Sequence, residues 1–260
     1  AAVAFGLGSA AQQQVVAREP RTVLPTGERR WVLGLAGVGV GLALQVTALA
    51  FAPVAAVQPV GVASVAVAAV AAGRGLDRAR ALGALTCAGG LAAFLVLARP
   101  VSGTGGRDVV PLALVLVLVL LATAVVARRR TGESRAVALA VAAGVCYGVS
   151  AGMLKVVADQ VRLGGPAEPF LHGAVYAALV VGPVGFVLSQ HAFRRARSAA
   201  PVLAVLTTVD PLVAVAVGVF WLGEQVVATP AALAGQALAA LAVLGGVAAV
   251  VRSERDPVPR

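Results

Sequence analysis

The sequence has few charged side chains, few aromatic side chains, two cysteines and a single lysine. Asp, Glu, Lys and Arg together make up 12% of its 260 residues, against about 25% in a typical soluble domain. Hydrophobic residues make up 60% and the mean hydropathy is +0.94, which excludes an ordinary soluble domain. Cys87 and Cys146 lie inside apolar stretches, and two such cysteines are too few and too buried for a disulfide scaffold or a metal site.

Motifs of enzymatic chemistry are also missing. The sequence contains no catalytic triad, no phosphate-binding loop and no cluster of metal ligands, so we expect neither enzymatic activity nor a cofactor. The net charge of +10 would suit nucleic acid, but the arginines form no patch with aromatic residues between them. We interpret them as orientation signals that contact anionic lipid headgroups, and we expect no nucleic-acid partner.

Long apolar stretches occupy most of the chain. A helix needs about 20 apolar residues to cross the hydrocarbon core, and nine stretches approach that length: 1–17, 31–52, 54–73, 80–98, 109–127, 136–158, 170–190, 199–222 and 230–251. Runs such as 110–127 show no apolar/polar alternation, which excludes a transmembrane barrel and leaves helices. The sequence predicts an all-α, polytopic membrane bundle of about nine transmembrane helices, forming one transmembrane domain over residues 1–260.

The basic residues are divided unequally between alternate loops of this arrangement. One side receives 17 of the 21: Arg18, Arg21, Arg29, Arg30, Arg74, Arg78, Arg80, Arg128, Arg129, Arg130, Arg135, Arg194, Arg195, Arg197, Arg252, Arg255 and Arg260. The other side receives Arg99, Arg107 and Arg162, and Lys155 lies inside a stretch. Short loops rich in arginine stay in the cytoplasm. The pattern therefore predicts a multi-pass protein of the cytoplasmic (inner) membrane with a cytoplasmic C-terminus.

The first apolar stretch allows two interpretations. The sequence starts at Ala1, which already lies inside this stretch. Either a truncated sequence or a short first helix would account for this start. The alternative is a cleaved signal peptide, because residues 1–11 are apolar and rich in small side chains. We favour the helix because no basic segment is visible before it and further apolar residues follow Gln12–Gln14.

Two segments of the chain form a weak internal repeat. Gly83 follows Pro59 by 24 residues, and Gly235 follows Pro211 by the same interval. From the distribution of basic residues between the loops, we expect the two segments to cross the membrane in opposite directions. Inverted repeats of this kind are found in many secondary transporters. We place the half-repeats at approximately 1–100 and 128–252.

Three segments resemble a known group of transporters. They read WVLGLAGVGVGLALQVTALAFAPVAAVQP (31–59), ALGALTCAGGLAAFLVLARP (81–100) and TTVDPLVAVAVGVFWLGEQ (207–225). From residue 31 onward the chain resembles the drug/metabolite transporter superfamily, which contains the EamA-type permeases. Its layout is most similar to the NIPA-type magnesium-transporter branch. The resemblance implies a secondary transporter or channel-like carrier whose two halves rock to alternate access. The chain departs from the family at 74–77, which read RGLD in place of Leu-Gly-Glu, so only Glu224 keeps that glutamate.

Asp210 is the strongest candidate for a functional residue. It lies near the middle of its apolar stretch, and Pro211 follows it. A carboxylate in hydrocarbon is costly and marks function by default, and the proline frees a backbone carbonyl nearby. We expect Asp210 to bind a cation or to exchange a proton. The alternative is that it hydrogen-bonds Thr207 or Thr208, or is held protonated by its surroundings.

Neutral amides supply the next candidates. Gln58, before the helix-breaking Pro59, corresponds to Asp210 in the other half-repeat, and its amide can orient a ligand or form an interhelical hydrogen bond. Gln45 is a further candidate for the cavity, although packing between helices accounts for it better.

A lysine and two polar residues of the stretch 136–158 complete the predicted site. Lys155 lies four residues before Asp159, which allows an ion pair, and snorkelling of its ammonium to the interface is the simplest account of its position. Tyr147 and Ser150 lie one or two turns earlier and extend a polar stripe toward a cavity. Glu224 is better explained as part of a structural turn.

The leading hypothesis is secondary transport of a small polar or amphiphilic metabolite or drug, with a binding cavity at the repeat interface near mid-membrane. The alternative is uptake of magnesium or another divalent cation, for which metal ligands remain unknown. A third class, a scaffold without transport activity, would have no polar groups in a cavity, and Asp210 argues against it. The expected partners are the lipid bilayer and the small-molecule or ion substrate, and a homodimer is compatible with the sequence.

Overall fold

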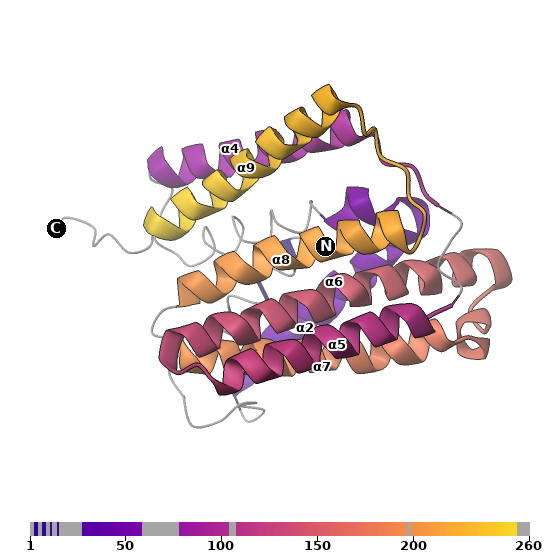
Figure 1. The fold of residues 1–260 in the computed structure, drawn as a ribbon, viewed down its shortest axis with the longest axis horizontal. Coiled ribbons are helices and arrows are strands. Elements are labelled where there is room, and N and C mark those ends of the chain that lie inside the picture. The colour runs from indigo at the N-terminus through magenta and orange to yellow at the C-terminus, as the bar shows by residue number, and fades with distance from the viewer. Residues whose placement is uncertain are drawn as a thin grey trace. The chain divides into compact units, whose positions relative to one another are not determined.

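The computed structural model describes residues 3–4, 7–8, 11, 15, 28–58, 78–103, 108–196 and 199–253. Within this part of the chain the fold is all-α (Figure 1), as predicted, and its only β-structure is one antiparallel bridge between Val101 and Gln225. The helices are α2 (Arg29–Phe51), α4 (Arg78–Ala98), α5 (Val110–Arg128), α6 (Gly132–Gly164), the 3-10 helix η1 (Glu168–Leu171), α7 (Gly173–Arg195), α8 (Ala199–Phe220) and α9 (Pro230–Ser253).

Four of the described helices are long and apolar enough to cross a membrane: α2, α5, α6 and α7. The chain is therefore built as a multi-pass membrane protein. The described residues contain four such spans and not the nine predicted; in α4, α8 and α9 the apolar segments whose side chains are described are Leu85–Ala98, Thr208–Phe220 and Pro230–Gly246. Most of the predicted stretches 1–17 and 54–73 lies outside the described residues.

The chain divides into two compact units. The first comprises residues 1–45, 59–100 and 226–260, and the second comprises residues 46–58 and 101–225.

Close contact between α4 and α9 characterises the first unit (Figure 1). A Cβ atom added at Gly90 would lie 2.8 Å from the carbonyl oxygen of Ala239, and one added at Gly246 would lie 2.5 Å from that of Gly83. Rising residue numbers in one helix thus meet falling numbers in the other, so the pair is antiparallel. Glycine at these positions lets the two backbones touch, as small residues do between membrane helices.

Helix α6 is the centre of the second unit. Gly144, Gly148 and Gly152 lie one turn apart on the face that packs against α8. A Cβ added at each would come within 3 Å of atoms of α8, at Val209, Val213 and Val217 in turn. Because the residue numbers of the two helices rise together, α6 and α8 are parallel.

The neighbouring face of α6 packs against α7. A Cβ at Gly185 would lie 2.8 Å from that of Cys146, and one at Gly182 would lie 3.4 Å from the hydroxyl oxygen of Ser150, which makes these two helices antiparallel. Both contacts belong to the face that also buries Met153 in a core cluster with residues of α5, α7 and α8. The four helices α5–α8 therefore pack around a shared apolar core.

Candidate functional site

The turn between α2 and the helical segment 54–58 is the first feature of the candidate site. Helix α2 ends at Phe51, and the turn consists of Ala52 and Pro53. The last carbonyls of a helix have no donor within it. Here the carbonyl of Leu49 would ordinarily accept from residue 53, but a proline has no backbone N–H.

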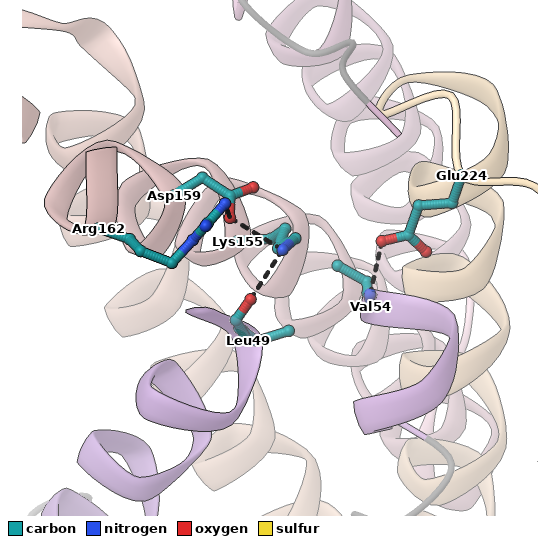
Figure 2. Close-up of polar contacts among 6 residues, drawn as sticks. All are labelled: Leu49, Val54, Lys155, Asp159, Arg162 and Glu224. Atoms are coloured by element: carbon teal, nitrogen blue, oxygen red, sulfur yellow. Dashed lines mark hydrogen bonds and ion pairs between the residues drawn. The ribbon is translucent and has the colours of Figure 1, made fainter. Parts of the chain in front are cut away.

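Lys155 of α6 supplies a donor to that carbonyl. Its ammonium donates to the carbonyl oxygen of Leu49 at 2.8 Å and to Oδ1 of Asp159 at 3.0 Å (Figure 2). The predicted ion pair with Asp159 is thus present, and Arg162 lies 3.8 Å from the same carboxylate oxygen. The Lys155 side chain is only 5% exposed, so its ammonium is held inside the protein in place of the expected snorkelling.

Glu224 serves the other side of the same turn. Its Oε1 accepts from the backbone N–H of Val54 at 2.6 Å (Figure 2), and its Oε2 accepts from that of Ala55 at 2.9 Å. These two N–H groups open the helical segment 54–58 and have no acceptor within it. Burial raises the pKa of the Glu224 carboxyl, while the N–H groups of Ala55 and Val54 and the charge of Lys155 oppose that shift.

Two glycines place the Glu224 carboxylate. Gly223 has φ +67°, a left-handed conformation, and the next backbone N–H, that of Glu224, returns to the carbonyl of Gly218 at 2.9 Å. A Cβ added at Gly218 would lie 2.5 Å from Oε2 of Glu224. The end of α8 is thus shaped to receive this carboxylate, and the structural role predicted for Glu224 in a turn agrees with its contacts.

Asp210 lies at the middle of α8, where its backbone packs against Gly144 and Gly148 of α6. Its Oδ1 is buried and has no hydrogen-bond partner within the described part of the chain. Pro211 removes the donor that the carbonyl of Thr207 would otherwise have. The side chain of Thr207 lies outside what the structure describes.

Tyr147 and Ser150 face α7. The Tyr147 hydroxyl lies 3.1 Å from that of Ser189, which donates to the carbonyl of Phe186 at 2.7 Å. Because the Ser189 proton is used there, Tyr147 must be the donor in their mutual bond. The sequence did not predict a role for Ser189, because a single serine in an apolar stretch belongs to no recognisable motif.

The remaining predicted residues do not join one cluster. Gln58 is buried and its Nε2 has no partner among the described residues, Gln45 is half-buried and belongs to the first unit, and Pro59 lies outside the described residues. Lys155 lies 7 to 11 residues beyond the glycines that Asp210 contacts, about 10 to 17 Å along the axis of α6. Asp210 and Lys155 therefore lie at different positions along the axis of α6 and do not belong to one polar cluster.

Metal ligands do not gather in the described part of the chain, where no three His, Cys, Asp or Glu residues come together. No protein-family model, curated protein or solved structure matches this sequence.

Proposed function

We propose that the chain is a secondary-type membrane transporter that moves a small polar or amphiphilic metabolite or drug by alternating access, as its resemblance to the drug/metabolite transporters implies. The observation that carries the proposal is a buried carboxylate oxygen, Oδ1 of Asp210, which has no partner among the described residues and lies in the middle of an apolar helix.

A purely structural role explains Asp210 poorly. A charged residue at the centre of a membrane helix costs about 2.5–3.5 kcal/mol on insertion scales, and a buried acceptor left without a donor costs about 1–3 kcal/mol. A carboxylate retained for stability would use its acceptors within the fold. A proton, a cation or a donor group of a solute can supply the missing partner, and each belongs to a transport cycle.

The first unit supports the inverted repeat on which alternating access depends. The two glycines that mark the repeat, Gly83 and Gly235, lie on opposite helices of the antiparallel α4–α9 pair. Gly83 contacts α9 near Gly246, and Gly235 contacts α4 near Leu97. Equivalent residues therefore occupy equivalent places at opposite ends of the pair, which is the arrangement that an inverted repeat would produce.

Magnesium transport is the second candidate, and the same carboxylate oxygen favours it. Magnesium keeps several waters and is commonly held by one or two carboxylates. A single carboxylate, with Oδ1 of Asp210 unpartnered among the described residues, is compatible with that mode, whereas an all-protein cage is not formed by the described residues.

Reconstituted protein separates these candidates. Proteoliposomes would be tested with three probes: ethidium, a mixture of radiolabelled amino acids, and Mg²⁺ read by a trapped fluorescent indicator, each with and without a proton gradient. The variants are Asp210→Asn and a matched control, Asp108→Asn. Asp108 is exposed and its Oδ1 accepts from the N–H of Val110, a bond that asparagine retains.

We expect ethidium or amino acids to accumulate with wild-type protein and with Asp108→Asn, and to fall at least tenfold with folded Asp210→Asn. Flux of Mg²⁺ alone, lost in Asp210→Asn, would establish the second candidate. Equal fluxes in wild type and Asp210→Asn would remove Asp210 from the pathway, and probe movement no faster than in protein-free vesicles would reject transport of all three solute classes.

A further inference from the structure

We propose that Lys155 is a positioning residue whose ammonium replaces the backbone donor that Pro53 lacks, and so holds the turn between α2 and the segment 54–58. The consequence for transport rests on the proposed function, whereas the role in the turn does not.

The hydrogen bonds at the end of α2 stop at the proline. The N–H of Ala52 still donates to the carbonyl of Ala48 at 3.0 Å. The next bond in a regular helix would join residue 53 to Leu49, and proline cannot form it. The Lys155 ammonium lies 2.8 Å from that carbonyl oxygen, so a side chain 106 residues away stands where the missing N–H would be.

The next two backbone donors are also diverted to a side chain. In a continuous helix, residues 54 and 55 would donate to the carbonyls of residues 50 and 51, but here both donate to Glu224. Three consecutive helical hydrogen bonds are thus replaced by one cation and one anion. Their signs suit their places, because the C-terminal end of a helix attracts positive charge and the N-terminal end attracts negative charge.

The environment of Lys155 also argues against a solute contact. Two of the three N–H groups of its ammonium are engaged, by Leu49 and Asp159. Asp159 balances its charge, and the side chain is only 5% exposed. A lysine that recognises an anionic solute needs free donors and an unbalanced charge. We therefore assign Lys155 to the turn and not to the predicted binding site.

A double-mutant cycle tests the pairing of Lys155 with Pro53. The variants are Lys155→Met, Pro53→Ala and the double variant, purified in detergent and followed by the midpoint of thermal unfolding. The alanine introduced by Pro53→Ala has the N–H that proline lacks, so it can donate to Leu49 and make the ammonium dispensable there. We expect Lys155→Met to lower the midpoint by several degrees in the wild-type background and by less than half as much in the Pro53→Ala background.

The matched control is Pro230→Ala. Pro230 is the first residue of α9, where a missing N–H costs nothing, so this change should not rescue Lys155→Met. Lys155→Arg, which keeps the donors, should unfold closer to wild type than Lys155→Met. If Lys155→Met alone yields no folded protein, the readout becomes the folded fraction on size exclusion, which Pro53→Ala should restore. Equal losses in the wild-type and Pro53→Ala backgrounds would overturn the proposal.

Transport provides the readout that separates positioning from solute contact. With whichever probe depends on Asp210, the double variant should regain most of the flux lost in Lys155→Met. A double variant that is folded but inactive would show that Lys155 contacts the solute. The unfolding cycle needs no solute, so it remains decisive if every probe fails. Conversely, a failed rescue leaves the dependence of flux on Asp210 unaffected.

Discussion

The Glu224 carboxylate offers the sharpest test of how the turn at Ala52–Pro53 is held. We predict that Glu224→Gln destabilises the protein, although the change is nearly isosteric. The carboxylate accepts two backbone N–H groups, one on each oxygen, and Glu224 is buried, with 3% of the residue exposed. The amide of glutamine retains one acceptor and turns an NH₂ group toward the second N–H, so a donor faces a donor.

The size of the effect follows from these contacts. A hydrogen bond to a charged group contributes about 1.5–3 kcal/mol, and one of the two is lost. The other loses its charge assistance, which roughly halves it, and the favourable interaction of a negative charge with a helix N-terminus, about 0.3–1 kcal/mol, also disappears. Because these contributions overlap, we expect a net loss of about 2–4 kcal/mol in the free energy of unfolding.

The assay is reversible denaturant unfolding in mixed micelles, followed by circular dichroism. This signal does not depend on Trp221, which packs against the apolar cluster that contains Leu49 and Val54. Glu133→Gln is the matched control, because Glu133 is exposed in the first turn of α6, and it should change stability by less than about 0.5 kcal/mol. If the Glu224→Gln protein is as stable as the Glu133→Gln protein, the capping role is refuted. The buried N–H groups of Val54 and Ala55 would then not depend on the charge of the Glu224 carboxylate.

Three further changes have defined outcomes, the first in the yield of folded protein and the other two in the same unfolding assay. Gly148→Leu should prevent folding, because a Cβ there would lie 2.7 Å from atoms of α8. The control Gly89→Leu should be tolerated, because nothing lies within 4 Å of an added Cβ. Equal yields of the two folded variants would contradict the tight α6–α8 contact. Tyr147→Phe should cost about 0.5–1.5 kcal/mol, the contribution of one neutral hydrogen bond, and no loss would mean that its bond to Ser189 contributes nothing. Gly223→Ala should cost about 1–2 kcal/mol because φ is +67°, a conformation that side chains with a Cβ disfavour, and an unchanged stability would argue against the left-handed turn.

The helical class and the approximate ends of several helices could be predicted, because both follow from local composition. The apolar stretch 109–127 became α5 (Val110–Arg128), and 230–251 became α9 (Pro230–Ser253). Helix α6 is longer than its stretch 136–158 because polar turns extend it at both ends, to Gly132 and Gly164. Hydropathy marks the segment suited to hydrocarbon, and it does not mark where helical hydrogen bonding stops.

The candidate site was predictable only where its contacts are local. The Lys155–Asp159 pair follows from a four-residue spacing on one helix. The bond from Lys155 to Leu49 spans 106 residues and that from Val54 to Glu224 spans 170, and no spacing rule connects such positions. Pro53 indicates that a carbonyl lacks its donor, but the sequence does not show which side chain replaces it.

The spacing of three glycines in α6 indicates a packing face. Gly144, Gly148 and Gly152 recur every four residues, the spacing that places small side chains on one helical face. Their partners on α8 could not be inferred from that spacing, because any apolar helix offers a similar surface. The sequence therefore predicts which face of a helix packs inside the bundle. It does not predict which other helix that face contacts.

The antiparallel contact between α4 and α9 also has a consequence for biosynthesis. Helix α4 ends at Ala98 and α9 begins at Pro230, so the glycines of α4 meet their partner only after the intervening chain has been translated. At 5–20 residues per second this delay is on the order of ten seconds. During that time α4 lacks the helix that its backbone will touch. In nascent chains arrested before residue 230, α4 should accordingly be sensitive to quality-control proteases. Extension of the chain through α9 should remove this sensitivity.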